Sequence, residues 1–284
     1  MIAVDAGKCT QCGLCVEVCH EGCLTLNGDG LQINRSECST CTQCVALCPS
    51  QALTWKGAAP VRFERQRLPA PESLDELFKE RRSIRLFKRE KIDLALLAEI
   101  AGYGGYAPTH AFHLRAIVVD DDALIALLDQ VIMDNCRWLY RILYRLKVIA
   151  IVASWLGYGD ELVKARPKLE GTLRDGRAFR SMPTAFIFVV GDKMVPLSDV
   201  SAQYALANMM YYAQVKGVGT CLWANGPMFI DKNGRARRRL GVKPSERIFG
   251  AMYMGYPGVR FSNKVNGKAL AVTWNGAADT FENR

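Results

Sequence analysis

Eight cysteines among the first 48 residues constrain the fold of this 284-residue chain more than any other feature. They form two sets with the same Cys-x-x-Cys-x-x-Cys-x-x-x-Cys spacing, offset by 29 residues from position 9 to position 38. The sets are Cys9, Cys12, Cys15 and Cys19, and Cys38, Cys41, Cys44 and Cys48. Three thiolates at this spacing on a tight loop can face three corners of one iron–sulfur cube, so the fourth ligand has to come from elsewhere.

The fourth ligand of each cube is predicted to come from the opposite set. In the bacterial two-cluster pattern, the last cysteine of each run serves the other cluster. The expected ligand groups are Cys9, Cys12, Cys15 and Cys48 for one cluster, and Cys38, Cys41, Cys44 and Cys19 for the second. Two zinc sites are the alternative, but zinc takes four ligands from paired Cys-x-x-Cys knuckles. The spacing therefore favours two [4Fe-4S] clusters.

Residues 1–57 resemble a bacterial two-cluster ferredoxin over their full length, with a departure at His20, where the second half has Pro49. Cys23 aligns with Ala52 in the repeat, so we interpret it as a buried small hydrophobe and not as a ligand. Each half begins and ends on a short apolar run, which predicts strands near residues 2–4, 23–26, 31–33 and 52–55. A turn is predicted at residues 27–30.

The distribution of the cysteines indicates the cellular compartment of this unit. Nine of the eleven cysteines lie in the first 48 residues, and eight have metal-ligand spacing, which argues against a secreted disulfide scaffold. The chain starts without a basic and apolar leader, and its most apolar stretch is too short to span a bilayer. We therefore expect a cytoplasmic protein that does not enter a membrane.

The net charge of +9 is unevenly distributed. Residues 1–57 carry three basic and five acidic side chains, so the remainder carries +11. The basic residues are scattered and lack the interleaved aromatic side chains of a base-stacking surface. Nucleic acid is therefore not an expected partner.

A proline-rich basic linker, residues 58–72, separates this unit from the rest of the chain. Ser73 and Glu76 form a capping-box pattern that predicts the start of a helix. The helix runs into Arg81, Arg82, Ser83 and Arg85, whose guanidinium and hydroxyl groups can bind a phosphate. A solvated basic turn is the alternative.

Residues 74–270 resemble the FMN-dependent nitroreductase family through an ordered set of motifs. The first is Arg-Arg-Ser-x-Arg-x-Phe at residues 81–87. Two turns that precede predicted strands follow: Ala-Pro-Thr at 107–109 before a strand at 116–120, and Met-Pro-Thr at 182–184 before a strand at 185–190. The last two are a helix at 208–213 that runs into Gly-Val-Gly-Thr-Cys at 217–221, and Gly-Tyr-Pro at 255–257 with Lys268 downstream. The resemblance implies an α+β chain: a small ferredoxin-like two-cluster module, then a nitroreductase-like α/β sandwich over residues 73–284 with a mixed sheet flanked by helices.

The resemblance also implies FMN contacts and a homodimer with flavin at the subunit interface. Arg81, Arg82, Ser83 and Arg85 would hold the FMN phosphate and ribityl chain, and Lys268 and Lys264 would reach the phosphate from the C-terminal side. Residues 219–226 would lie along the flavin ring. The expected contact residues there and in the Ala-Pro-Thr motif are Pro108, Thr109, Gly219, Thr220, Ala224 and Asn225.

Three further side chains lie near these motifs. Ala111 and His113 stand where the family usually has an Asn and a Gln that contact flavin. His110 and His113 are candidates for donating hydrogen bonds to flavin or for protonating a reduced substrate, because histidine titrates near neutrality. The alternative is that both are surface-loop residues. Cys221 follows the glycine segment and is interpreted as a buried small residue, with a redox role as the alternative.

The middle of the chain predicts a long helix over residues 134–154. Arg137, Arg141 and Arg145 recur every four residues and form one stripe along it. The stripe is either a solvated face or a docking surface for an acidic partner.

Fusion of a one-electron carrier with a flavin domain predicts an FMN-dependent oxidoreductase. Electrons would pass from two [4Fe-4S] clusters to FMN, which would reduce a small organic acceptor such as a nitroaromatic or quinone. The expected donor is a ferredoxin-type or other low-potential carrier, with NAD(P)H as the alternative. The alternative functions are a specialised reductase of an activated alkene or biosynthetic intermediate, and a redox relay or sensor without a substrate.

Overall fold

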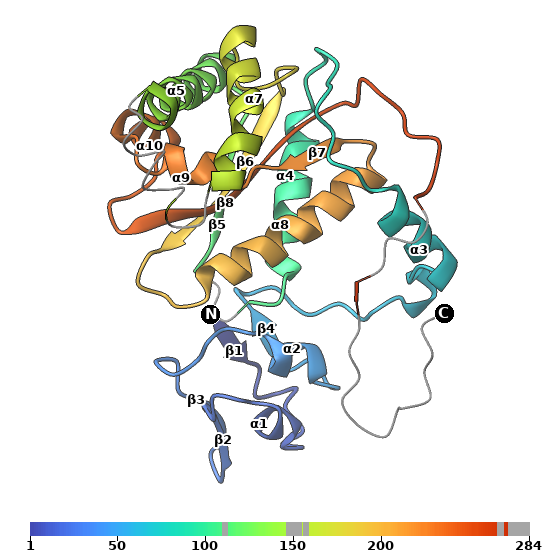
Figure 1. Ribbon diagram of the computed structural model, residues 1–284. Coiled ribbons are helices and arrows are strands. Elements are labelled where there is room, and N and C mark those ends of the chain that lie inside the picture. The colour runs from blue at the N-terminus through green and yellow to red at the C-terminus, as the bar shows by residue number, and fades with distance from the viewer. Residues whose placement is uncertain (110–112, 146–154, 156–158, 266–269, 272–284) are drawn as a thin grey trace, which may run out of the picture.

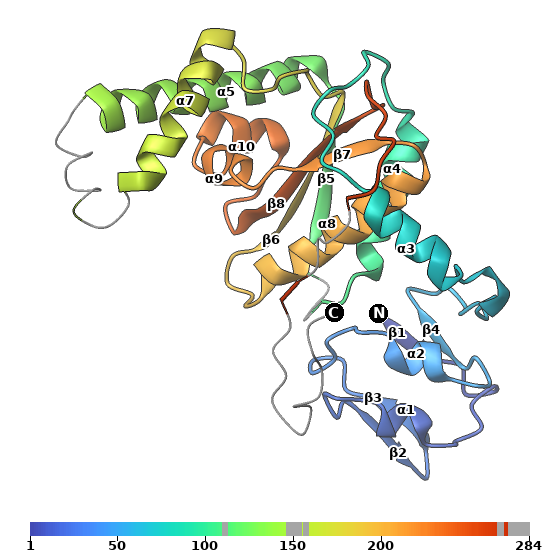
Figure 2. The same ribbon diagram turned by 45° about the vertical axis from the view of Figure 1, so that its right-hand side comes forward.

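The computed structural model describes residues 1–109, 113–145, 155, 159–265 and 270–271. His110, Lys268 and most of the predicted C-terminal part of the 134–154 helix lie outside these residues. Figures 1 and 2 show the chain from two directions.

The N-terminal unit, drawn in blue in Figure 1, has the two-fold internal repeat that its sequence predicts. Strand β1 (Ile2–Val4) pairs antiparallel with β4 (Leu53–Trp55), and β2 (Leu24–Asn27) pairs antiparallel with β3 (Gly30–Ile33). The short helices α1 (Leu14–Glu17) and α2 (Gln43–Leu47) lie between the strands in sequence. The strand predictions are confirmed, and the predicted turn joins β2 to β3. One small cluster of buried residues holds the unit together: Ile2, Cys23, Leu24, Leu31, Cys44, Val45 and Leu53.

The connection to the rest of the chain contains a short 3-10 helix, η1 (Arg65–Arg67), followed by helix α3 (Pro71–Glu80). The predicted capping box at Ser73 is wrong. The helix begins two residues earlier, at Pro71, and its N-cap residue Ala70 makes no side-chain cap bond. Proline suits the first helical position, because its fixed φ fits a helix and its missing N–H would have no partner there.

A four-stranded sheet forms the centre of the larger body. Its order is β5 (Arg115–Val119), β6 (Ala185–Asp192), β8 (Glu246–Gly255) and β7 (Gly219–Leu222). Strand β6 is central and buried nearly throughout, as its continuous apolar sequence predicts. Within the described residues every pairing in this sheet is antiparallel, so the mixed character expected from the resemblance is not seen there.

Helices cover both faces of the sheet, as Figures 1 and 2 show. On one face lie α5 (Asp122–Tyr140), α9 (Gly226–Ile230) and α10 (Gly234–Leu240), which bury side chains against Phe186 and Phe188. On the other face lie α4 (Leu94–Gly102), the 3-10 helix η2 (Tyr103–Tyr106) and α8 (Ser198–Val215). The expected α+β layering is confirmed.

The long middle helix starts earlier than predicted. Helix α5 begins at Asp122 because the Asp121 carboxylate accepts hydrogen bonds from the free N–H groups of Ala123 and Leu124. It continues into a π-helical turn, η3 (Arg141–Arg145), and packs beside α7 (Gly159–Asp175). The predicted arginine stripe is exposed, and Arg137 forms an ion pair with Asp134 at 2.7 Å. No helix in the described part of the chain is both long and apolar enough to cross a membrane.

Arg115 and Glu246 link the sheet from β5 to β8 across the central strand. The guanidinium donates from Nε to Oε1 at 2.8 Å and from Nη2 to Oε2 at 2.7 Å. This bidentate pair lowers the pKa of Glu246 to about 2, although burial opposes the shift. A carboxyl whose pKa is lowered on folding stabilises the fold above its unfolded pKa, and the contribution is lost as pH falls through the folded value.

We therefore expect Glu246→Gln to reduce the pH dependence of stability between about pH 5 and about pH 2. The measurement is the urea midpoint followed by circular dichroism at both ends of this window. Wild type should lose more stability on acidification than the variant. The matched control is Glu64→Gln, because Glu64 belongs to an exposed pair with Arg67 that contributes little. Identical pH profiles for wild type and Glu246→Gln would contradict the assignment.

Candidate functional site

Left-handed residues shape the two cysteine loops in the same way. Gln11, Gly13 and Gly22 in the first half, and Thr40, Thr42 and Gln51 in the second, all have positive φ and are related by the 29-residue repeat. Non-glycine residues rarely adopt this conformation. Its recurrence at equivalent positions shows that the backbone follows the same tight path twice, which turns three cysteines of each loop toward one side.

The structure gathers the eight cysteines around two small cavities. One cavity is lined by Cys9, Cys12, Cys15 and Cys48. The other is lined by Cys19, Cys38, Cys41 and Cys44, with Cys23 beside them. The last cysteine of each run thus lies with the first three of the other run. This is the arrangement that the crossed ligand prediction requires.

The thiols of each group line one cavity. All eleven cysteines are unpaired. Among the described residues, no three His, Cys, Asp or Glu side chains are placed to hold a single metal ion. A tetrahedral zinc site needs sulfurs about 2.3 Å from one centre. Four thiols that line one cavity provide the four ligands that a [4Fe-4S] cube takes.

Burial and hydrogen bonding give the thiols different acidities. Burial raises the pKa of Cys44 to about 11. Burial also disfavours the Cys48 thiolate, but the Ser50 hydroxyl and backbone N–H groups, including that of Ala52 at 3.3 Å, outweigh it and lower the pKa of Cys48. Ligation by thiolates therefore releases protons, and metal binding at these sites is coupled to pH.

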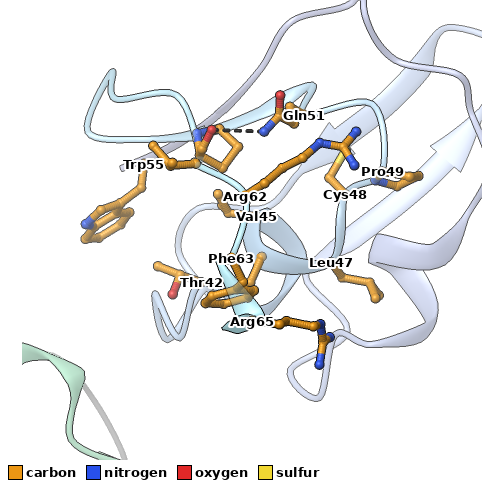
Figure 3. A pocket seen from close by; sticks show the side chains of 13 residues that line it. Thr42, Val45, Leu47, Cys48, Pro49, Gln51, Trp55, Arg62, Phe63 and Arg65 are labelled. Atoms are coloured by element: carbon orange, nitrogen blue, oxygen red, sulfur yellow. Dashed lines mark hydrogen bonds between the residues drawn. The ribbon is translucent and has the colours of Figure 1, made fainter. Parts of the chain in front are cut away.

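A groove of about 480 Å³ lies beside Cys48 (Figure 3). Helix α2 and the loop after it form one wall, and residues 60–65 of the linker form the other. Gln51 donates a hydrogen bond to the Pro60 carbonyl at 3.0 Å, which ties the linker to the N-terminal unit. Arg62 and Arg65 line the groove, and Phe63 is 80% exposed. The groove thus combines positive charge with exposed aromatic surface next to a predicted cluster ligand.

The arginine-rich segment after α3 lies against the glycine segment of β7. The Ile84 N–H donates to the Thr220 carbonyl at 2.9 Å. A Cβ on Gly219 would approach the Ile84 side chain to 2.8 Å, so only glycine allows this contact without a shift. The structure therefore brings together the predicted phosphate-binding residues and the predicted flavin-binding strand.

The same segment is held at its other end by Phe87. Its backbone N–H donates to the Ser181 hydroxyl at 3.1 Å, and that hydroxyl donates to the Phe87 carbonyl at 3.1 Å. Phe87 also bridges to Pro257, and its ring fills the space in front of Gly255. Residues 84–88 are thus fixed between β7 and the segment after β8, which positions the arginines before them.

The four predicted phosphate-binding residues have different environments. Arg82 donates to the carbonyls of Lys79 and Arg81, so its guanidinium closes the end of α3. Arg85 is exposed, whereas Arg81 and Ser83 are half-buried. Sequence reasoning missed Tyr253, which pairs with Cys221 across β7 and β8. Burial and a hydrogen bond with Cys221 raise the pKa of Tyr253, and nearby Arg85 opposes the shift.

The remaining predicted contacts are spread over several elements. Pro108 and Thr109 follow η2, which packs on α8, and Ala107 before them is buried. His113 is exposed. Ala224 and Asn225 are exposed at the start of α9, and Thr220 is buried within β7. Lys264 forms an ion pair with Glu76 of α3, which places it beside the helix that leads to the arginines.

Two family models match this chain, one over the N-terminal cysteines and one over the larger body. Residues 8–52 match the family model of a 4Fe-4S dicluster domain. Residues 78–256 match the model of the nitroreductase family, and this match spans more than half of the chain. The chain therefore belongs to the nitroreductase family and carries a dicluster domain before the family fold.

Solved structures support the fold assignment. The chain is similar to a nitroreductase with bound FMN from Bacteroides fragilis, at 19% identity over 70% of this chain and 98% of that one, with a TM-score of 0.50. A second nitroreductase with bound FMN, from Desulfitobacterium hafniense, gives 18% identity over 72% and 100% of the two chains, with a TM-score of 0.51. An iodotyrosine deiodinase bound to FMN and 3-iodo-L-tyrosine gives 21% identity over 72% and 99%, with a TM-score of 0.51. No curated protein matches the chain.

We expect Cys12→Ala to lose about half of the protein-bound iron and sulfide, because Cys12 belongs to one of two separate thiol groups. The measurement is iron and sulfide per chain after anaerobic reconstitution. Cys136→Ala is the matched control, since Cys136 lies in α5 and should leave both contents unchanged. Loss of all iron in the control, or none in Cys12→Ala, would contradict the grouping.

Proposed function

We propose that this chain is a ferredoxin-fused flavin oxidoreductase that passes electrons from two [4Fe-4S] clusters to FMN and on to a small organic acceptor such as a nitroaromatic or quinone. The observation that carries the proposal is that one chain combines two cavities, each lined by a crossed set of four predicted ligand cysteines, with an arginine segment fixed against the glycine strand of a nitroreductase fold. We assign residues 1–57 to the electron carrier, 58–72 to the linker and 73–284 to the flavin domain.

The residues around Ile84 fit an FMN phosphate and ribityl chain. Arg85 is exposed and therefore available for a charge-assisted bond to phosphate, and Arg81 and Ser83 lie within the same turn. Arg82 donates hydrogen bonds to carbonyls at the end of α3, so we assign it the role of stabilising the turn. Lys264 and Lys268 would supply positive charge from the C-terminal side.

The strand beside the arginines fits the flavin ring. Gly219 brings the backbone close to Ile84, and the chain then passes through Ala224 and Asn225, which are exposed and can offer backbone N–H groups to the ring. When bound, FMN supplies the ability to accept single electrons from clusters and to deliver a pair to an acceptor. That ability is the physical reason for joining the two domains in one chain.

The groove beside Cys48 is where the proposed donor would bind. The N-terminal unit is acidic from its side chains alone, and two clusters with their thiolates add further negative charge. An acidic carrier protein is repelled by most of this surface, whereas Arg62 and Arg65 attract it to the groove. The exposed ring of Phe63 adds apolar area at the same place. Positive charge and apolar area at one place thus support a ferredoxin-type donor.

Helix α8 supports the proposed homodimer. It leaves Val200, Tyr204 and Val215 exposed, although the helix is long and otherwise well packed on the sheet. Contiguous exposed apolar surface marks interaction sites, and Val200 and Tyr204 lie one helical turn apart on the same face of α8. A second copy of the chain is the partner that the family resemblance implies.

We expect Arg85→Ala to weaken FMN binding by about tenfold or more, because a hydrogen bond to a charged group contributes about 1.5–3 kcal/mol. Flavin content and the FMN dissociation constant are measured beside iron content. Arg235→Ala is the matched control, since Arg235 is an exposed arginine on α10. Undiminished FMN binding in Arg85→Ala would contradict the phosphate assignment.

We expect the double variant Arg62→Glu, Arg65→Glu to slow cluster reduction by a reduced ferredoxin roughly tenfold at low salt, because charge steering governs the rate of association. Reduction by dithionite should stay unchanged. The double variant Arg235→Glu, Arg238→Glu, at two exposed arginines of α10, controls for the same change in net charge. An equal rate with ferredoxin in wild type and double variant would exclude the groove as the donor site.

Wild-type protein with both cofactors bound also distinguishes an enzyme from a relay. With reduced ferredoxin as donor, turnover of a nitroaromatic or quinone supports the reductase, whereas full reduction of both cofactors without turnover of any acceptor supports a relay or sensor.

A further inference from the structure

Cys23 is a fifth thiol at the second cluster cavity. Its side chain is buried, and its Sγ lies 3.4 Å from the Sγ of Cys19. It lines the same cavity as the four predicted ligands Cys19, Cys38, Cys41 and Cys44. A [4Fe-4S] cube takes four thiolates, so this cavity offers one sulfur more than the cluster needs.

The internal repeat shows that the fifth thiol is specific to one half. Ala52 is the counterpart of Cys23 at the 29-residue offset, as Cys48 is the counterpart of Cys19. Ala52 places a backbone N–H, not a side-chain sulfur, against Cys48, at 3.3 Å. The cavity of Cys9, Cys12, Cys15 and Cys48 is lined by no further cysteine. The two cluster sites therefore have the same backbone path but differ in the number of cysteine side chains that line them.

The backbone around Cys23 is fixed, so any movement belongs to the side chain. The Asn34 N–H donates to the Cys23 carbonyl at 2.8 Å, and the next residue, Leu24, is paired with Ile33 in the β2–β3 ladder. A rotation about the Cα–Cβ bond is the motion left to the thiol. Its sulfur is already in contact with that of Cys19, so a rotation of this side chain is the movement that an exchange of the two thiols would need.

We propose that Cys23 is a reserve ligand of the second cluster, which donates its S–H to the Cys19 thiolate and replaces Cys19 when that residue leaves the iron. The proposal rests on the cluster assignment made above. In the exchange, the iron–sulfur bond to Cys19 breaks and a bond to the Cys23 sulfur forms. The proton of Cys23 passes to Cys19, so the cluster keeps its charge and its oxidation state.

The contact between Cys23 and Cys19 also affects the reduction potential of the second cluster. A hydrogen bond to a ligand sulfur stabilises the more negative, reduced cluster and so raises the reduction potential. Cys23 would therefore raise the potential of the second cluster relative to one without the fifth thiol. Removing the thiol should leave four ligands in place and shift only that cluster.

The test compares variants of the full-length chain after anaerobic reconstitution, with iron, sulfide and flavin quantified and the reduced protein examined by electron paramagnetic resonance. Cys19→Ala should keep the wild-type iron content, with an altered spectrum for one cluster. Cys48→Ala, its repeat counterpart, should lose half of the iron. The double variant Cys19→Ala, Cys23→Ala should also lose half. Loss of half of the iron in Cys19→Ala alone overturns the proposal.

A second measurement covers the case in which Cys19→Ala yields no folded protein. Cys23→Ala keeps all eight predicted ligands and should bind two clusters, one of them with a more negative potential and the other unchanged. An unchanged pair of potentials overturns the proposal. Wild-type protein that binds no iron would instead defeat the proposed function, so the two failures are distinguishable.

Discussion

The exchange of the fourth cysteine between the two halves is the constraint on which the N-terminal unit depends. Cys48 lies with the thiols of the first loop, and Cys19 lies with those of the second. Neither ligand set is complete until both halves are folded and in contact. The buried residues of this unit form only a small cluster around Leu24 and Leu53. A core of this size stabilises little by itself, so metal binding and folding are expected to be one event.

In the larger body, the corresponding constraint is the set of contacts that holds the basic segment around Arg85 in one position. The segment with Arg85 has no helix or long strand of its own. It is held by one backbone hydrogen bond to Thr220, by the Ser181 hydroxyl at Phe87 and by two glycines that leave room for Ile84 and Phe87. These contacts come from residues 181–255, which are distant from the segment in sequence. Contacts with the rigid sheet thus fix the position of the arginine side chains, which a charged turn could not do by itself.

The sequence predicts those features that follow from short-range chemistry. The strands near Ile2 and Leu53 and the crossed cysteines follow from a repeat that spacing alone reveals, and the central strand at Ala185 follows from its continuous apolar run. Capping signals were less decisive. Ser73 fits the start of a helix, but Pro71 fits it better, and Asp121 starts the middle helix well before its predicted first residue. Tyr253 could not be assigned, because its contact with Cys221 depends on the register of two strands far apart in the chain.

The hydrogen bond from Gln51 to the Pro60 carbonyl sets the length of the tether between the two redox units. It fixes the chain as far as Pro60, and α3 fixes it again from Pro71. The ten residues between them can span at most roughly 35 Å when fully extended. A linker of this length keeps the local concentration of one unit around the other in the millimolar range. The proposed delivery of electrons within the chain would then have a rate that does not change when the protein is diluted.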